Sequence, residues 1–321
     1  MKRATFVAGA LAANAAAARP VRAQERRPLN IAYLASALGA PVFVAADRGY
    51  FAAEGFDATL SPIGAGLDAM ALAATGRIDI VAAGLSAGYF NAIDRGLDVR
   101  YVASTAYTPR TGSSPTALLV RYDLWSDGAV KQIAQLRGLK FGWTGGLAST
   151  ATYYVTRMLQ PAGLSMRDIS VVSLTLPNQA TALQNKSIDA IYSGSPQMEA
   201  FEEQKLAHIF AYPPAGISGS GIFFGARLIR DRGMASAAMR AVRRAAAAIV
   251  GAGYYQPDTV ATLAKYVQQP AAEIARSPRY EIDARLTIDV KTLMDMQRLF
   301  AQLGLLSYPE PIEQSRLIMS I

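Results

Sequence analysis

Residues 41–57 read PVFVAADRGYFAAEGFD, and their pattern is the most informative in the chain. Pro41 suits the first turn of a helix, because the amide hydrogen that proline lacks would have no partner there. The apolar residues that follow are spaced to form one face of a helix, and Gly49 provides a left-handed stop. A second short turn ends at Gly55, and residues 56–60 have the pattern of a strand. The stretch therefore predicts a helix and a turn that lead into a strand.

Strand and helix patterns alternate through most of the 321 residues, which predicts mainly parallel α/β sheets flanked by helices. From Ser236 onward the pattern is helical. The strands that we expect are 29–34, 56–60, 78–83, 99–104, 116–121, 139–143, 170–174, 188–192, 206–212 and 222–226.

The two halves of the chain repeat each other. Asp79 is followed five positions later by Gly84, and Asp189 is followed by Gly194 at the same spacing. The two copies lie 110 positions apart, from Asp79 to Asp189. A repeat of this length is too long for the unit of a solenoid, and it favours two lobes that share one topology. We interpret both aspartates as turn residues rather than ligand-binding groups, because aspartate favours such turns.

The first 23 residues are typical of an export signal. Lys2 and Arg3 precede an alanine-rich apolar run, with small residues at positions −3 and −1 before Gln24. The run is too short to span a membrane. It holds four of the 32 basic residues and none of the 24 acidic ones, so cleavage lowers the formal charge from +8 to +4. No basic run with interleaved aromatic residues follows, which argues against a nucleic-acid partner.

The chain has no cysteine and a single histidine, His208. These counts exclude disulfides, thiolate catalysis and any metal site built from several histidines or from cysteines. We expect His208 to be a core or edge residue of a strand. Neither a metal nor a cofactor is expected.

Several motifs together identify a resemblance. The opening pattern P-x-x-x-A-x-x-x-G-x-F-x-x-E-G follows a strand, and the motifs LRGLKFG (136–142), AGLSMRDI (162–169) and ATALQNKSIDA (180–190) follow it in order. This series resembles the periplasmic solute-binding proteins of the nitrate/sulfonate/taurine group, whose fold is shared by thiamine-precursor-synthase-like proteins. The family places a glycine before the second repeat strand. Here residues 185–187 stand in its place, and Asn185 is the candidate for left-handed backbone.

The resemblance implies the two-lobe periplasmic-binding-protein type II fold, with a ligand cleft between the lobes. By analogy, residues 29–118 and 220–321 form lobe one, and residues 119–219 form lobe two. The two crossing segments, 107–117 and 213–221, are rich in residues that suit a hinge.

Ligands of open α/β sheets bind beyond the carboxyl ends of the strands, where helices begin and free amide groups are available. The glycines of the segment 143–150 let backbone approach a ligand, and Ser149 or Thr150 could cap the following helix. Applied to both lobes, this rule selects Ser36, Gly64, Gly66, Leu85, Ser86, Trp143, Thr144, Ser149, Thr150, Asn178, Gly194 and Ser195.

Four aromatic residues are candidates for the walls of the cleft, or else for the core: Tyr89, Tyr107, Trp143 and Tyr153. Arg110, in the first crossing segment, is the candidate partner for a carboxylate or sulfonate, unless it is a solvated loop residue. Together these residues favour an organic anion with an apolar or aromatic body.

We therefore expect a periplasmic, monomeric solute-binding protein that closes over its ligand and delivers it to the membrane permease of an ABC importer. No enzymatic activity is expected. A binding protein for a pyrimidine thiamine precursor is the alternative. An enzyme of the thiamine-precursor-synthase kind is disfavoured, because such enzymes use histidine and a cysteine-rich segment. A sensory protein that docks on a receptor kinase fits the sequence as well as a transport protein does.

Overall fold

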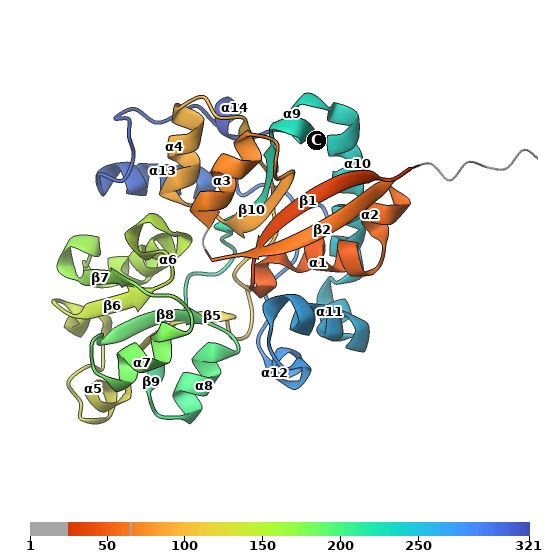
Figure 1. Cartoon of the computed structure of the whole chain (residues 1–321). Coiled ribbons are helices and arrows are strands. Elements are labelled where there is room, and N and C mark those ends of the chain that lie inside the picture. Colours follow the sequence, from red (N-terminus) through yellow and green to blue (C-terminus); the bar gives the residue numbers. More distant parts are fainter. Residues whose placement is uncertain (1–24, 65) are drawn as a thin grey trace, which may run out of the picture.

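The computed structural model describes residues 25–321, apart from residue 65 and the side chains of residues 66–68. The predicted export signal therefore lies outside the described residues. Two lobes lie side by side, each built on one sheet, and the chain passes from the first to the second and back (Figure 1). The predicted fold class, two mainly parallel sheets with flanking helices, is confirmed.

The first sheet has the strand order β2-β1-β3-β10-β4, in which β10 alone runs antiparallel to its neighbours. We call the part of the chain around it the first lobe. Its strands are β1 (Arg27–Leu34), β2 (Phe56–Ile63), β3 (Ile80–Gly84), β4 (Val99–Ser104) and β10 (Ser220–Gly225).

The second sheet repeats this order as β7-β6-β8-β5-β9, with β5 as the antiparallel strand. In each sheet, the antiparallel strand is the one with which the chain arrives from the other lobe. The strands of the second lobe are β5 (Thr116–Arg121), β6 (Lys140–Trp143), β7 (Ser170–Ser173), β8 (Ala190–Gly194) and β9 (Ala207–Ala211).

All ten predicted strands are therefore present, with ends shifted by up to three residues. The first crossing is complete before Thr116, where β5 begins. The predicted boundary between residues 118 and 119 falls inside that strand. All of β5 pairs with strands of the second sheet, so its first residues belong with the second lobe.

Helices cover both faces of the sheets, and the C-terminal helices lie mainly on the first lobe (Figure 1). Helices of the first lobe are α1 (Ala40–Asp47), α2 (Tyr50–Ala53), α3 (Gly66–Ala74), α4 (Ala87–Asp94), α9 (Ala226–Arg230), α10 (Arg232–Ala248), α11 (Pro257–Val267), α12 (Ala271–Arg276), α13 (Val290–Gln302) and α14 (Gln314–Leu317). Those of the second lobe are α5 (Tyr122–Ser126), α6 (Thr150–Leu159), α7 (Asn178–Gln184) and α8 (Gln197–Glu203).

The opening stretch folds as its pattern predicts. Pro41 lies in the first turn of α1, and Gly49 has the left-handed φ of 69° that separates α1 from α2. Gly55, with φ of 82°, leads into β2. The helix differs from the prediction in one respect: residues 40–45 are all buried, not only one face. The reason is that α1 packs between the sheet and the helices α10 and α11.

The two repeat aspartates have structural roles, as predicted. Each one contacts a neighbouring strand and an arginine, beyond the predicted role in a turn. Asp79 accepts from the backbone amide of Asn30 at 2.7 Å and forms a two-pronged ion pair with Arg227. Asp189 accepts from the amide of Lys140 at 3.0 Å and from Arg121 at 2.9 Å. Each aspartate therefore ties the start of a central strand to its neighbours.

The left-handed residue before the second repeat strand was predicted one position too early. Asn185 has φ of −80°, and Lys186 adopts the left-handed φ of 55°. Its counterpart in the first repeat is Gly76, with φ of 76°. The turn thus keeps its geometry and accepts a lysine, whose side chain pairs with Asp123 at 2.8 Å.

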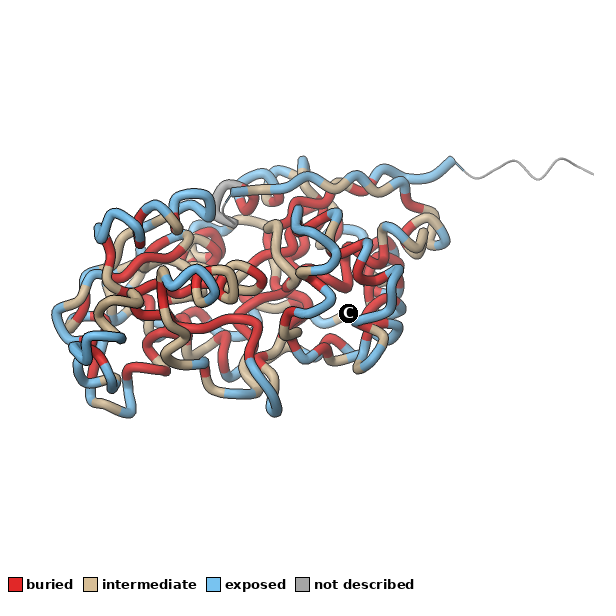
Figure 2. Tube along the Cα trace, turned by 90° about the horizontal axis from the view of Figure 1, so that it is seen from below, coloured by how far each residue is buried: buried red, intermediate tan, exposed pale blue. Residues whose placement is uncertain are grey.

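Buried residues run through the middle of both lobes, and exposed residues lie on the outside (Figure 2). One apolar cluster joins the lobes. It contains Tyr89 and Phe223 of the first lobe, Tyr154 of the second, and Leu293 and Met296 of α13. The lobes are therefore packed against each other on one side, next to the cleft described below.

Candidate functional site

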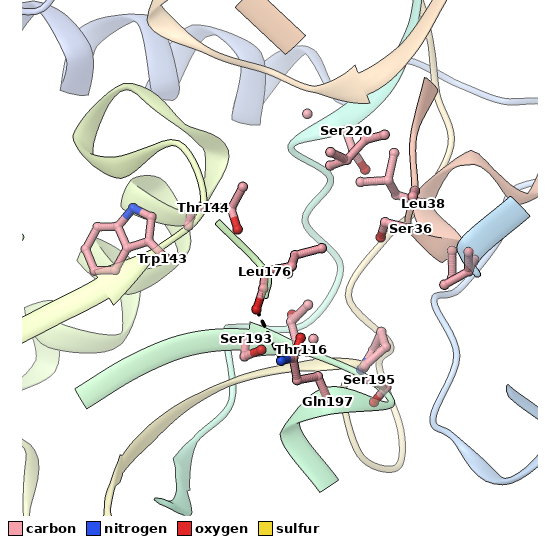
Figure 3. Close-up of a pocket in the computed structure, with 18 of the residues that line it drawn as sticks. Ser36, Leu38, Thr116, Trp143, Thr144, Leu176, Ser193, Ser195, Gln197 and Ser220 are labelled. Carbon is pink, nitrogen blue, oxygen red and sulfur yellow. Dashed lines mark hydrogen bonds between the residues drawn. The ribbon is translucent and has the colours of Figure 1, made fainter. Parts of the chain in front are cut away.

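A cavity of about 1010 Å³ lies between the lobes, where the carboxyl ends of the parallel strands of both sheets meet. The residues labelled in Figure 3 come from both sides: Ser36, Leu38 and Ser220 belong to the first lobe, and the others belong to the second. We call this cavity the cleft. Ten of the fourteen predicted site residues line it: Ser36, Gly64, Leu85, Ser86, Trp143, Thr144, Ser149, Thr150, Gly194 and Ser195.

Two helices begin at the cleft, one from each lobe. Ser86 precedes α4 and Ser149 precedes α6, both with extended backbone. Neither hydroxyl caps its helix. Ser149 donates to the carbonyl of Gly146 at 2.8 Å, and the Ser86 hydroxyl oxygen is buried without a partner among the described residues. The predicted cap by Ser149 or Thr150 is therefore absent, and amide groups at both helix starts remain available to a ligand.

The glycine turn of the second lobe is shaped by two left-handed residues, Gly145 with φ of 81° and Gly146 with φ of 54°. The turn brings the carbonyl of Gly146 back to the indole N–H of Trp143, at 2.8 Å. Trp143 is fully buried, so its ring supports the turn from behind and does not form an open wall.

Thr150 joins the lobes at the inner end of the cleft. Its hydroxyl donates to the carbonyl of Leu85 at 2.6 Å, with the carbonyl of Gly219 at 3.1 Å as a second acceptor. A Cβ atom on Gly84 would lie 2.4 Å from the Thr150 oxygen, and one on Gly219 would lie 2.4 Å from its methyl group. The two glycines of the first lobe thus leave the space that Thr150 fills.

A chain of polar side chains lines the second-lobe wall, and it was predicted only in part. Ser193 donates to the Gln179 side chain at 3.0 Å, and Gln179 donates to Thr144 at 3.4 Å. The hydroxyl of Tyr192 donates to Thr116 at 2.8 Å. Ser193 begins the segment 193–196 that the strand-end rule selects, whereas Gln179 follows the predicted Asn178 and was missed by one position.

Four tyrosines line the cleft, and none was predicted: Tyr154, Tyr192, Tyr254 and Tyr280. Tyr154 and Tyr192 stack with ring centroids 6.0 Å apart. Burial raises the pKa of all four hydroxyls, so they stay protonated at neutral pH. The first two belong to the second lobe and the others to the C-terminal part of the chain, for which the sequence offered no motif.

The charge of the cleft is low. Among the described residues no lysine, arginine or histidine lines it, and Glu273 of α12 is the charged side chain that does. The Glu273 carboxylate is paired with Arg276 of the same helix. In the described part of the chain, no cluster of three or more histidine, aspartate or glutamate residues is placed to hold a metal ion.

Four of the fourteen predicted site residues do not line the cleft. Tyr89 is fully buried and its hydroxyl donates to the carbonyl of Leu317. The Arg110 side chain is 70% exposed, lies 3.6 Å from Glu281, and lines a separate surface hollow. Asn178 is exposed beside the cleft. Gly66 lies at the start of α3, and its burial falls outside the described residues.

Two further aromatic candidates are also elsewhere. Tyr107 donates to the carbonyl of Thr287, and Tyr153 is buried next to Tyr154. Successive residues of a helix point in different directions, so Tyr154, and not Tyr153, reaches the cleft.

The fold and the cleft define the structural class of the protein: the two-lobed periplasmic-binding-protein type II fold, with a cavity between the lobes. Within that class, the chain belongs to the NMT1/THI5-like family, whose model matches residues 38–252. No curated protein sequence matches the chain significantly.

Solved structures share the fold over almost the whole chain. The alkanesulfonate-binding protein SsuA from Xanthomonas axonopodis pv. citri, bound to MOPS, has a TM-score of 0.72 and 21% identity, covering 92% of this chain and 99% of that one. The periplasmic aliphatic sulphonate-binding protein SsuA from Escherichia coli has a TM-score of 0.70 and 20% identity, covering 91% and 97%. The periplasmic nitrate-binding protein NrtA from Synechocystis PCC 6803 has a TM-score of 0.68 and 13% identity, covering 91% of this chain and 84% of that one.

These three neighbours are binding proteins. The desulfurization enzyme DSZB also shares the fold, with a TM-score of 0.61 and 14% identity over 92% of this chain and 97% of that one. The fold therefore occurs in binding proteins and in an enzyme. The residues of the cleft, and not the fold, must distinguish between these two functions. Across the described residues, no helix is both long and apolar enough to cross a membrane.

Proposed function

We propose that the protein is the exported, periplasmic solute-binding component of an ABC importer, and that it acts as a monomer. The observation that carries the proposal is the cleft itself, because its walls come from both lobes and from the helix starts of both sheets. Three structural neighbours, which are named as sulfonate-binding and nitrate-binding proteins, support this role.

Closure of two lobes over a ligand requires no chemical step. A ligand that touches both walls binds the closed form better, and so shifts the balance toward it. The two lobes that move would be those predicted from the sequence: residues 29–118 with 220–321 form one, and residues 119–219 form the other. The first boundary is placed before β5, which begins at Thr116. The segments between β4 and β5 and between β9 and β10 are the candidate hinge.

The ligand would be a small organic molecule with an apolar body. Leu38, Leu176, Val267 and Ile274 line the cleft together with the tyrosines, and a volume of about 1010 Å³ exceeds what a small inorganic ion needs. Two charge classes are candidates: an organic anion such as a sulfonate or carboxylate, and a neutral molecule such as a pyrimidine. The arginine that the sequence assigned to the anion lies outside the cleft.

The competing function is an enzyme. The thiamine-precursor-synthase chemistry uses histidine and cysteine; the chain has no cysteine, and His208 lies on the edge strand β9, stacked on Trp125 and paired with Glu202. His208 does not line the cleft.

Ligand-induced closure tests the proposal. The purified protein is screened by thermal unfolding against sulfonates, carboxylates, carboxamides and pyrimidines. A ligand at 100 times its dissociation constant is expected to add about 2.7 kcal/mol to the free energy of unfolding. Hits are then examined by small-angle X-ray scattering, in which binding is expected to lower the radius of gyration. Conversion of a bound compound to a product would contradict the proposal and favour an enzyme.

A further inference from the structure

The charge of the cleft is the starting point. Among the described residues, no lysine, arginine or histidine lines it. The charged side chain that lines it is Glu273, whose carboxylate is paired with Arg276. An anion buried here would face no positive side chain of the described lining, and burying an unpaired charge is costly.

Several hydroxyl groups of the cleft are not free to make up for this. Four of them already donate to acceptors within the protein, so their protons are not available to an anion. These are Ser149 to the Gly146 carbonyl, Thr150 to the Leu85 carbonyl, Ser193 to Gln179 and Ser195 to Glu199.

The Ser86 hydroxyl differs from these four. Ser86 lines the cleft, its hydroxyl oxygen is buried, and no described group bonds to that oxygen. A buried hydroxyl without a partner is unfavourable, so the site gains from a ligand group that bonds there. A serine hydroxyl both donates and accepts, so it suits a carbonyl, an amide or another hydroxyl.

We infer that the cleft takes an uncharged organic ligand, with an apolar body and a polar group that bonds to Ser86, in preference to the matching organic anion. The inference rests on the proposed binding function and specifies its ligand class. The amide groups at the starts of α4 and α6 then act as hydrogen-bond donors to a neutral oxygen. Their partial positive charge alone does not repay the loss of water around a full negative charge.

Matched pairs of ligands test the inference. Isothermal titration of the purified protein compares benzamide with benzoate, hexanamide with hexanoate, and toluenesulfonamide with toluenesulfonate, at pH 7. Within each pair the body is the same and the charge differs. The neutral member is expected to bind at least ten-fold more tightly. Equal or tighter binding of the acids would overturn the inference and leave the binding function intact.

Ser86 gives a second test on the same pairs. The Ser86→Ala variant is expected to bind the neutral ligands at least five-fold more weakly, whereas Ser86→Thr, which keeps the hydroxyl, is expected to stay closer to the wild type. Thermal unfolding of both variants without ligand shows whether they are folded. Unchanged affinity of Ser86→Ala for the neutral ligands would remove Ser86 from the site.

The protein as purified gives a third test, by native mass spectrometry. A co-purifying neutral molecule would support the inference, and a co-purifying acid would overturn it. If no neutral member of any pair binds, the inference also fails. In that case a co-purifying molecule would still uphold the binding function, whereas its absence together with a silent screen would count against the binding function as well.

Discussion

The two lobes repeat one topology but bury the aspartate of its central ion pair to different depths. Asp79 of the first lobe is fully buried, whereas the Asp189 side chain is 27% exposed; the arginine partners differ the other way, with Arg227 36% and Arg121 12% exposed. Arg227 binds Asp79 with two nitrogens, and Arg121 divides its contacts between Asp189 and Asp123. The first lobe also carries most of the C-terminal helices, with a large apolar cluster around α1, α10 and α11. The same strand order is thus tied by a fully buried aspartate in one lobe and by a partly exposed aspartate in the other.

Removal of the repeat aspartates is the strongest way to break this comparison. Asp79→Ala leaves Arg227 and the amide of Asn30 without their partner, and we expect a loss of about 3–5 kcal/mol in the free energy of unfolding. Asp189→Ala is expected to cost about 1–2 kcal/mol, because Arg121 keeps Asp123 as a partner. Urea unfolding measures both.

Asp57→Ala serves as the control, since Asp57 is exposed on β2 and its loss is expected to stay within about 0.5 kcal/mol. If Asp79→Ala and Asp189→Ala lower the free energy of unfolding by the same amount, the burial of the aspartate does not distinguish the two lobes.

Two glycines in central strands extend the comparison to backbone packing. A Cβ atom on Gly221 of β10 would lie 1.9 Å from the carbonyl oxygen of Ala103, which is backbone and cannot move aside. On Gly142 of β6, the Cβ would lie 2.4 Å from the end of the Leu174 side chain, which can rotate. We expect Gly221→Ala to cost about 3 kcal/mol and Gly142→Ala about 1 kcal/mol in unfolding free energy. A larger effect at Gly142 would show that the second lobe is the more tightly packed one.

Much of the fold could be predicted from the sequence because its signals are local. Gly49, Gly55 and the alternation of strands and helices act through neighbouring residues, and they predicted the ten strands. The two lobes were predicted from the repeat of the two halves and from the family resemblance. The turn at Lys186 was placed one position too early because several residue types tolerate left-handed backbone there. A lysine can be held in it by an ion pair that only the fold reveals.

The cleft could be predicted only in part. Strand ends select loops, so most residues chosen by that rule line the cleft, including Ser86 and Thr150. Side-chain direction and long-range contacts are not local. Tyr154 lines the cleft instead of the predicted Tyr153, because successive residues of a helix point in different directions. Tyr280 also lines the cleft, although it is far from Tyr154 in the sequence, and Arg110 contacts Glu281 instead of the cleft. A charged residue near a crossing segment is therefore weak evidence for a ligand contact.

The contact between the lobes can be weakened without changing its shape. Thr150→Val keeps the volume that Gly84 and Gly219 accommodate, but it removes the hydroxyl that donates to the carbonyl of Leu85. We expect a loss of about 1–2 kcal/mol in unfolding free energy, because that carbonyl loses its partner. Thr150→Ser keeps the hydroxyl and is expected to retain most of the stability. A Thr150→Val variant as stable as the wild type would show that the lobes are held by the apolar cluster alone.

Acid is expected to loosen the second lobe at Asp123. Burial alone would raise the pKa of this carboxyl, but hydrogen bonds from Arg121 and Lys186 outweigh it and lower the pKa to about 2. In the unfolded chain the pKa is about 3.9. The folded carboxylate therefore stabilises the protein fully above about pH 4, and this contribution is lost as the pH falls toward about 2. The Asp123 side chain is 34% exposed, so we expect the contribution to stay below about 1 kcal/mol. In urea unfolding between pH 5 and pH 3, the stability difference between the wild type and Asp123→Asn should shrink as the pH falls. A difference that is constant over this range would mean that the ion pair with Arg121 and Lys186 does not stabilise the second lobe.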